Sequence, residues 1–561
     1  MMSRRAGVWI SACGLWAMMG IAGSGGQNAT PQNDPGQAQG FKIAGTIVNA
    51  VTGAPLERVR VSIANTRARN QRIEMVTAEG GHFEFTGQPA GKYSLQGTRR
   101  GYLTSSYEQH EQYSTAIVTG PEFATDKLVL RLMPMAMITG HVLDESGETV
   151  RSAHVQLFLE DHSAGMSRIL GVTGGSSTDD RGYFDFAVLR PGRYFVSASA
   201  TPWYAVHPVT GQGGGETKGS GLATLDVAYP TTYYGGGTES ENAAPIDLKG
   251  GEKREIEIRL RPVPALHLIV RVPVETSGDT PSDANVFWFP VLQKRVFDSV
   301  EPVKPGQVQL LSPGVLEVLG MPAGRYDLSI RGRKPDEVRQ FGEIDLEHDG
   351  QDLNVAQGET LAKLKVKLQT EETLPKQYAL FLRDGRQRTV AFAQGEAAGQ
   401  VSFPAVKPGK YAIVVVAPGK NYAVTRTTSR TGESVGSGVN VASGAAMEVT
   451  AQLVEGVVGI EGVVEKNGKP MAGVMVALVP SDPESHVELF RRDQSDFDGT
   501  FMLRGVIPGT YTIVAVEDAW GFEWLKTGVL ARYVQHGQNV IVGEKMRGMV
   551  HLPEPLEVQG K

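Results

Sequence analysis

A short pattern of glycine, proline and tyrosine recurs five times along this 561-residue chain, and its spacing does not change. In each copy a second glycine lies ten residues after the first, and a tyrosine lies twelve residues after it. A register kept this strictly indicates one folding unit repeated five times. The copies are GHFEFTGQPAGKYSL (81–95), GYFDFAVLRPGRYFV (182–196), GVLEVLGMPAGRYDL (314–328), GQVSFPAVKPGKYAI (399–413) and GTFMLRGVIPGTYTI (499–513).

Each copy contains two short strands joined by a tight turn. Apolar and polar residues alternate on both sides of the turn, which is typical of strands with one face against a core. In the second copy Pro191 fixes φ and Gly192 accepts a positive φ, as a type II turn requires. The sequence therefore predicts a β-hairpin. The alternation places Tyr326, Leu328 and Ile330 of the third copy on the core side, and we expect the repeated tyrosine to bind a backbone group through its hydroxyl.

Further strands surround each copy. A glycine-led strand precedes copies one, two and five, and a glycine turn and a second strand follow it. Strands after the copies have apolar residues at every second position. About six or seven strands per unit are expected, as in a β-sandwich. The glycine-led strands begin at Gly45, Gly140 and Gly462, and the later strands contain Leu128, Leu130 and Leu132, then Ile256, Ile258 and Leu260, then Leu364, Val366 and Leu368.

The glycine-led strand, the T-D-x-x-G-x-F turn and the P-G-x-Y segment together resemble the carboxypeptidase regulatory-like domain. That domain is a transthyretin-like member of the Ig-like sandwiches. The resemblance is close in copies one, two and five. Copies three and four lack the glycine-led strand and resemble the domain more weakly. The resemblance implies a module that accompanies peptidases and many other exported proteins and has no catalytic residues itself.

The chain is thus expected to be all-β, a tandem array of about five Ig-like/transthyretin-like β-sandwich domains. The short junctions contain proline, which predicts an elongated, semi-rigid array. The expected boundaries are 1–22 for a signal peptide, 23–40 for a disordered linker, 41–135 for β-sandwich 1 (carboxypeptidase regulatory-like), 136–264 for β-sandwich 2 with an aromatic and Gly-rich insertion at 200–245, 265–371 for the degenerate β-sandwich 3, 372–456 for the degenerate β-sandwich 4, and 457–561 for β-sandwich 5 (carboxypeptidase regulatory-like).

The first residues have the three-part layout of a secretory signal. Arg4 and Arg5 precede an apolar stretch that ends in small residues near Ala22. Cys13 resembles the cysteine of a lipoprotein signal, but the apolar stretch continues past it, which favours ordinary cleavage. Cys13 is the only cysteine, so we expect no disulfides in the processed chain. The predicted location is secreted, either periplasmic or extracellular at the cell surface.

Charge and hydropathy limit the partners of the processed protein. The formal charge is −6, which provides no basic surface for nucleic acid. No later segment approaches the roughly 18 continuous apolar residues that a membrane-spanning helix requires. We therefore expect no nucleic acid and no integral membrane segment after removal of the signal.

The catalytic and metal-binding motifs lack the context that they require. His551 and Glu554 have the spacing of zinc ligands in metallopeptidases, but Pro553 lies between them. Ser434 lies in a G-x-S-x-G segment whose polar flanks lack the strand and helix of a nucleophile elbow. The three aspartates of segment 493–499 are typical of a Ca²⁺ loop or, as we favour, of a simple turn. We expect neither an enzyme nor a cofactor, and no metal site.

Aromatic residues in the insertion of the second unit are the best candidates for ligand binding. They are Trp203, Tyr204, Tyr233 and Tyr234, which lie among turn residues in a segment that the other copies lack. Rings at a loop surface can stack on sugars or on a partner protein. The alternative is that they pack beneath the insertion as a local core. The same alternatives apply to Trp520, Phe522 and Trp524 of the fifth unit.

These features predict an exported, non-catalytic β-sandwich repeat protein of the cell envelope. We expect it to bind a polysaccharide through the aromatic insertion, with a carbohydrate-binding-like fold. The alternative is a structural spacer or adhesin that contacts another envelope protein.

Overall fold

The computed structural model describes residues 40–561 except 69–70, 164, 173, 209–222, 273–288, 332–337, 355–360, 372, 386–387, 397–398, 430–436, 484–485 and 527. The expected signal peptide 1–22 and the expected linker up to residue 39 lie outside the described residues, as does the middle of the insertion 200–245. Strands dominate the described part, and its single α-helix is α1 (Ala531–Val534). No described helix has the length and apolar character needed to span a membrane.

The chain forms five β-sandwich modules, each with its own buried apolar core, which confirms the predicted fold class. Module 1 contains β1 (Phe41–Asn49), β2 (Arg60–Asn65), β3 (Arg72–Val76), β4 (His82–Gln88), β5 (Gly91–Thr98), β6 (Ser105–Ser106), β7 (Ile117–Thr119) and β8 (Leu128–Leu132). Module 2 contains β9 (Ala136–Leu143), β10 (His154–Asp161), β11 (Arg168–Gly171), β12 (Ser176–Ser177), β13 (Tyr183–Leu189), β14 (Gly192–Ser199), β15 (Val227–Ala228), β16 (Thr232–Tyr233), β17 (Ile246–Leu248) and β18 (Lys253–Arg259).

The remaining modules follow after β19 (Val263–Pro264), which pairs with β15. Module 3 contains β20 (Leu266–Arg271), β21 (Phe289–Val296), β22 (Ser299–Val303), β23 (Gln307–Ser312), β24 (Val315–Met321), β25 (Gly324–Arg331), β26 (Val338–Leu346) and β27 (Gln351–Asn354). Module 4 contains β28 (Ala362–Gln369), β29 (Gln377–Arg383), β30 (Thr389–Glu396), β31 (Gln400–Val406), β32 (Gly409–Ala417), β33 (Lys420–Ser429), β34 (Gly438–Val441) and β35 (Ala446–Glu455). Module 5 contains β36 (Val458–Lys466), β37 (Lys469–Pro470), β38 (Met475–Pro480), β39 (Arg491–Gln494), β40 (Thr500–Val506), β41 (Gly509–Val516), β42 (Gln538–Val542), β43 (Gly548–His551) and β44 (Leu556–Gln559).

The modules share one topology. In module 1 the first strand, β1, lies between β4, to which it is antiparallel, and β8, to which it is parallel. The second sheet has β2 between β3 and β5. The first strands of the other modules have the same two neighbours: β9 lies between β13 and β18, β20 between β24 and β27, β28 between β31 and β35, and β36 between β40 and β43.

The repeated proline-glycine turn joins the two sheets of a module, so the predicted hairpin is wrong. In module 2, β13 before the turn pairs with β9, whereas β14 after it pairs with β10 in the other sheet. The turn is therefore a β-arch. Apolar alternation shows that each strand has one buried face, but a hairpin and an arch both satisfy that pattern. The prediction could not separate them because the pairing partners lie far away in the sequence.

The repeated tyrosine is buried in all five modules, as predicted, and its hydroxyl is bound to the backbone of the arch. In each case the hydroxyl donates to the carbonyl four residues earlier. The bonds are Tyr93 to Pro89 (3.1 Å), Tyr194 to Arg190 (2.8 Å), Tyr326 to Pro322 (2.7 Å), Tyr411 to Lys407 (2.9 Å) and Tyr511 to Ile507 (2.7 Å).

The first glycine of each copy has the left-handed backbone, with φ between 67° and 78° in the five copies. We expected a positive φ at the second glycine, Gly192 in module 2, but Gly192 does not adopt it. The first glycine also lies against the first strand. A Cβ at Gly182 would lie 2.7 Å from the carbonyl oxygen of Val142, and one at Gly499 would lie 2.6 Å from that of Val464. Conformation and space therefore both require glycine there.

The first residue of the T-D-x-x-G-x-F turn, four residues before this glycine, supplies a buried hydroxyl whose hydrogen bonds the sequence did not predict. In module 2, Thr178 Oγ1 donates to Val150 O at 2.6 Å and accepts from the backbone N–H of Ala153 at 2.8 Å. Thr77 of module 1 and Ser495 of module 5 bridge the equivalent backbone groups. The hydroxyl thus attaches the turn to the segment before the second strand.

Modules 3 and 4 meet before the expected boundary at 371/372. We expected the strand with Leu364 and Val366 to end module 3. Instead, β28 pairs with β31 and β35, and its apolar residues lie in the core of module 4. The last strand of module 3 is β27, parallel to β20. Alternation identifies a half-buried strand but not the core that it faces.

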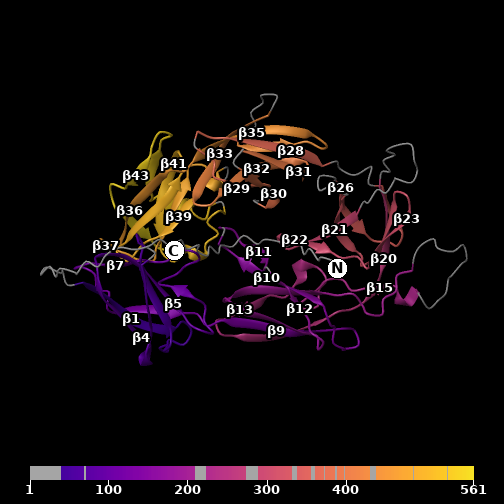
Figure 1. The fold of residues 1–561 in the computed structure, drawn as a ribbon, viewed down its shortest axis with the longest axis horizontal. Coiled ribbons are helices and arrows are strands. Elements are labelled where there is room, and N and C mark those ends of the chain that lie inside the picture. The colour runs from indigo at the N-terminus through magenta and orange to yellow at the C-terminus, as the bar shows by residue number, and fades with distance from the viewer. Residues whose placement is uncertain are drawn as a thin grey trace, which may run out of the picture.

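The modules form a closed ring instead of the predicted elongated array. Figure 1 shows modules 1 to 4 following one another around the ring and the yellow module 5 returning to the indigo module 1. Neighbouring modules touch directly. Lys407 of module 4, for example, lies 3.2 Å from Asp327 of module 3. Short, proline-containing junctions fix the angle between neighbours, but their composition does not give the direction of the bend.

Candidate functional site: the junction of modules 1 and 5

The structure separates the rings that were predicted to bind a ligand. Tyr233 is fully buried (0% exposed) and packs with Phe158 and Phe195 of module 2 and Phe297 of module 3. Its prediction as a surface contact is therefore wrong, because the ring fills the interface between these modules. Tyr234 is partly buried against the core of module 2. Tyr233 and Tyr234 therefore pack locally, which was the alternative to ligand binding.

Trp203 and Tyr204 remain at the surface of module 2. Trp203 is 85% exposed, and its ring meets Tyr204 edge-on at a centroid distance of 5.7 Å. Tyr204 donates its hydroxyl to Glu145 Oε1, and Tyr229 donates to Glu145 Oε2 at 2.7 Å. Glu145 thus holds the ring that supports Trp203, and Trp203 is the one predicted contact with an open face.

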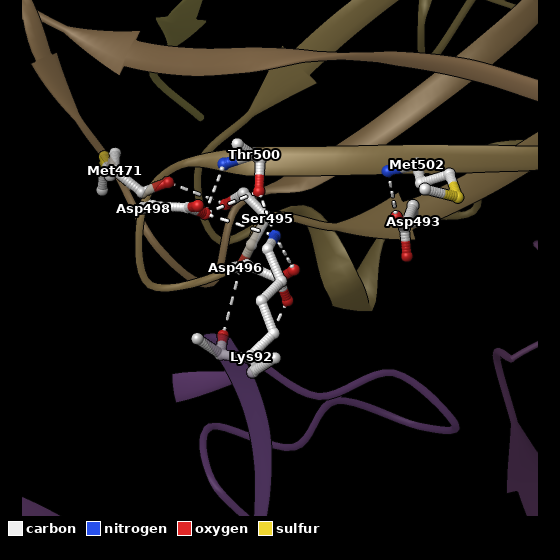
Figure 2. A network of polar contacts seen from close by, with 10 residues as sticks. Lys92, Met471, Asp493, Ser495, Asp496, Asp498, Thr500 and Met502 are labelled. Carbon is white, nitrogen blue, oxygen red and sulfur yellow. Dashed lines mark hydrogen bonds and ion pairs between the residues drawn. The ribbon is translucent and has the colours of Figure 1, made fainter. Parts of the chain in front are cut away.

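A polar network joins module 1 to the turn before β40 in module 5 (Figure 2). Lys92 on β5 donates to Asp496 Oδ2 at 2.5 Å and to the Thr500 hydroxyl, and it lies 3.4 Å from Asp498 Oδ1. Asp496 Oδ1 accepts from the backbone N–H of Ala116 at 2.9 Å. Two of the three aspartates that we weighed as a simple turn or as Ca²⁺ ligands, Asp496 and Asp498, therefore contact a cation of another module, and Asp496 also binds an N–H group there.

Arg492 on β39 connects three modules. Its Nη2 donates to Glu111 Oε2 of module 1 at 2.8 Å and to the carbonyl oxygen of Ser163 in module 2 at 3.0 Å. Its guanidinium carbon lies 4.6 Å from the ring centroid of Trp524 and 5.6 Å from that of Tyr113. The side chain is only 5% exposed. Buried among aromatic faces with one counter-charge, this guanidinium makes a directional contact that depends on all three modules.

The aromatic residues of module 5 that were left open as ligand contacts or packing lie largely in this interface. Trp520 stacks on His110 of module 1 at a centroid distance of 5.0 Å and an angle of 5°. Trp524 lies against Gly165 of module 2, where a Cβ would come within 2.4 Å of the indole. Phe522 is partly buried within module 5. Both tryptophans thus take part in packing between modules.

A cavity of about 1380 Å³ opens beside the interface. The outer face of β2 and β5 in module 1 contributes one wall, and β39, β40 and residues 551–555 of module 5 contribute the other. The lining is mainly polar, with a few aromatic rings. Its polar side chains include Ser62, Ser94, Gln96, Arg491, Asp493 and Arg504, and its rings include Tyr113 and Trp524.

Two titratable groups in this wall are strongly affected by burial. Burial raises the pKa of Asp493 to about 6, although Asp493 Oδ2 accepts a 2.7 Å hydrogen bond from the backbone N–H of Met502. Burial also lowers the pKa of the Arg491 guanidinium, whose Nε donates to the carbonyl of Gly505 at 3.0 Å. Groups perturbed by desolvation in a cavity are characteristic of binding sites.

The other chemical motifs do not assemble into a site in the described residues. His551 Nδ1 lies 2.6 Å from Glu461 Oε1, so its partner is not Glu554. Ser434 lies outside the described residues. In the described part of the chain, no group of three or more His, Cys, Asp or Glu side chains is placed to hold a metal ion.

Three charged residues that join modules 1 and 5, Lys92, Glu111 and Arg492, were missed because they lie outside the fixed positions of the repeat. Lys92 and Glu111 have no feature that distinguishes them from solvated charges. The sequence signal that could have indicated this interface was a difference between the copies of the repeat. Segment 493–499 has three aspartates where the equivalent turns have fewer.

The fold thus defines the protein as an array of Ig-like β-sandwich modules. Within it, residues 42–119 match the carboxypeptidase regulatory-like domain, which confirms the predicted resemblance for module 1. Residues 454–542 match the second beta sandwich domain of the BOS complex subunit NOMO1-like family. No curated protein matches the chain.

Several solved structures are similar to parts of the chain. The Bacillus anthracis TIE protein is 12% identical and is aligned over 74% of this chain and 69% of its own, with a TM-score of 0.16. The minor pilin GBS52 of Streptococcus agalactiae is 11% identical over 40% of this chain and 97% of its own, with a TM-score of 0.20. The shaft pilin SpaA of Lactobacillus rhamnosus GG is 12% identical over 40% of this chain and 98% of its own, with a TM-score of 0.18.

Proposed function

We propose that the protein is an exported, non-catalytic binding protein of the cell envelope, and that it holds a polysaccharide in the cavity between modules 1 and 5. The observation that carries the proposal is the cavity itself. Its volume of about 1380 Å³ exceeds the roughly 300–1,000 Å³ of typical small-molecule pockets, which leaves room for several linked sugar rings.

The lining has the chemistry that sugars require. Ser94 and Gln96 on β5 offer a hydroxyl and an amide, which exchange hydrogen bonds with sugar hydroxyls as both donors and acceptors. Tyr113 and Trp524 add aromatic surface to the same cavity. The proposal moves the polysaccharide site away from the aromatic insertion, because Tyr233 and Tyr234 of that insertion are engaged in packing.

A binding role without catalysis is supported by how the acids and the histidine of the cavity are engaged. Asp496 binds Lys92, and His551 is paired with Glu461. Asp493 accepts a backbone hydrogen bond. These side chains hold the two modules and their strands, and a binding protein requires no more of them.

Retention on a panel of immobilised polysaccharides tests the proposal. Ser94→Trp places a large side chain on the cavity wall at an exposed strand position, and we expect it to abolish retention of a polysaccharide that binds the wild type. Ala412→Trp is the matched control, because Ala412 is exposed at the same place after the repeated tyrosine of module 4 and is not among the cavity residues. Equal retention of the wild type and Ser94→Trp, or no retention of the wild type on the panel, would contradict the proposal.

The second candidate function is contact with another envelope protein, as a spacer or adhesin. The 85% exposure of Trp203 favours it, because large exposed rings are frequent at the centre of protein interfaces. A pull-down from envelope extracts should then recover a defined partner with the wild type and lose it with Trp203→Ala. Added polysaccharides should not compete. Fractionation of the cells tests export for both candidates.

A further inference from the structure

We infer that the polysaccharide held between modules 1 and 5 is acidic, and that Arg67 and Arg504 bind its carboxylates or sulfates from opposite walls of the cavity. This inference rests on the proposed function and narrows its ligand class.

Cationic side chains outnumber acidic ones in the lining, although the whole chain has a formal charge of −6. Arginine and lysine contribute six positions and aspartate and glutamate four. The cations are Arg67, Arg72, Lys92, Arg491, Arg492 and Arg504, and the acids are Glu461, Asp493, Asp496 and Glu554. A polar cavity lined by an excess of one charge attracts and concentrates ligands of the opposite charge.

Half of these cations already bind acids of the protein. Lys92 is paired with Asp496, and Arg492 with Glu111. Arg72 is paired with Glu74, and its Nη2 also donates to Ser62 and Gln96 on the cavity wall. These three side chains therefore hold the walls and leave the remaining three arginines to interact with a ligand.

The remaining arginines form no ion pair within the described part of the chain. Arg491 is held in place because its guanidinium donates to the backbone carbonyls of Glu488, Phe490 and Gly505. Arg504 is exposed on the neighbouring strand β40, and Arg67 is exposed after β2 in module 1. Guanidinium groups bind carboxylates and sulfates through paired hydrogen bonds, which a neutral sugar does not offer.

One acid of the lining, Asp493, is protonated more easily than an ordinary aspartate. Asp493 lies on β39, and burial together with the nearby Asp496 raises its pKa to about 6. The Asp493 carboxyl is thus easily neutralised in the presence of another anion. Glu461 is paired with His551, and Asp496 is paired with Lys92.

Matched ligands with and without charge on one backbone test the inference. We would measure binding by calorimetry for a galacturonate hexamer and its methyl ester, and for dextran sulfate and dextran, at about 0.15 M salt. At least one acidic form should bind about tenfold more tightly than its neutral partner, and higher salt should weaken it. Arg67→Gln and Arg504→Gln should each weaken binding of the acidic form about three- to tenfold and leave the neutral form unchanged.

Arg181→Gln is the control, since Arg181 is an exposed arginine of module 2 that does not line the cavity. If neutral and acidic forms bind equally, or if all three variants behave alike, the inference is wrong while the proposed function stands. If neither form of either pair binds, both the inference and the proposed function fail. Both tested arginines are exposed, so we expect each variant to have the melting temperature of the wild type. Thermal unfolding of each variant thereby excludes loss of the fold as the cause of weaker binding.

Discussion

The turn at 178–182 in module 2 and the turn at 495–499 in module 5 occupy the same position in two copies of the repeat, but their aspartates make different contacts. Both have a buried hydroxyl, Thr178 or Ser495, and both end in a left-handed glycine. In module 2 the Asp179 carboxylate stays within its own turn, where it accepts from the N–H groups of Arg181 and Tyr183. The corresponding Asp496 of module 5 reaches out to module 1.

The difference is made possible by one further acid. Asp498 of module 5, which replaces Arg181 of module 2, accepts from the N–H and the hydroxyl of Thr500 within its own turn. Asp496 is therefore released to bind Lys92 and the N–H of Ala116. The comparison shows that the hydroxyl and the glycine make the fold, whereas the carboxylates are interchangeable and can be used for an interface.

The largest effect is expected where module 5 has a contact with no counterpart in module 2. Arg492→Ala leaves Glu111 without its partner, and breaking a buried pair costs about 3–5 kcal/mol. We expect the ring to open, with a larger radius of gyration in small-angle X-ray scattering and faster hydrogen exchange in residues 110–116. Arg193→Ala, which breaks an exposed pair with Asp247, should leave both unchanged. An unchanged scattering profile for Arg492→Ala would show that this contact does not hold the ring.

The second-largest effect is expected in the pH dependence of stability, and it arises from Asp493, which corresponds in position to Ser176 of module 2. Its folded pKa of about 6 lies above the unfolded value of about 3.9, so the folded state binds the proton more tightly. The resulting stability is complete below about pH 4 and is lost as the pH rises to about 6, by at most about 3 kcal/mol. Asp493→Asn should therefore raise the melting temperature of module 5 at neutral pH and not at pH 4. Equal melting temperatures of the two proteins at neutral pH would contradict this pKa.

Glycine substitutions should affect the two turns equally. Gly182→Ala and Gly499→Ala each force a left-handed backbone on a residue with a Cβ and push that atom against a carbonyl oxygen. The strain alone corresponds to about 1–3 kcal/mol in each module. Chemical denaturation should show similar losses for both. A loss in one variant only would mean that the turns are not equivalent.

The smallest effect is expected when the first aspartate of each turn is replaced, and it should differ between the two turns. Asp496→Asn weakens the contact with Lys92, which is partly exposed, so we expect a cost of about 1 kcal/mol to the contact between modules 1 and 5. Asp179→Asn, the matched change in module 2, keeps an oxygen for its own turn and should not alter that contact. Hydrogen exchange at Ala116 measures both. If Asp179→Asn increases exchange at Ala116 as much as Asp496→Asn does, the two carboxylates do not have the different roles described above.

The sequence was sufficient for the local structure of the modules. The fixed positions of the tyrosines, such as Tyr194, revealed the repeat, and alternation placed them correctly in the cores. The sequence was not sufficient to predict which strands pair with one another. The arch was predicted as a hairpin, because β13 and β14 each have one buried face whichever sheet they join. The strand β28 was assigned to the wrong module for the same reason.

The candidate site could be anticipated far less. A cavity between modules 1 and 5 depends on the ring, and the ring depends on the bend at four junctions, which no local pattern encodes. Lys92 and Arg492 are ordinary charged residues until their partners, some 400 positions away in the sequence, are brought next to them. Tyr233 shows the reverse problem, because a ring among turn residues can as well fill an interface as face a ligand.

Because modules 1 and 5 belong to one chain, their contact forms under a high effective concentration. Two groups joined by a short connection experience each other at a concentration on the order of millimolar, and three folded modules with short junctions restrict the search further. An interface too weak to join separate proteins can therefore keep this ring closed. A single proteolytic cut at any of the four junctions would remove that advantage, and closure would then depend on the contacts that remain at the cut.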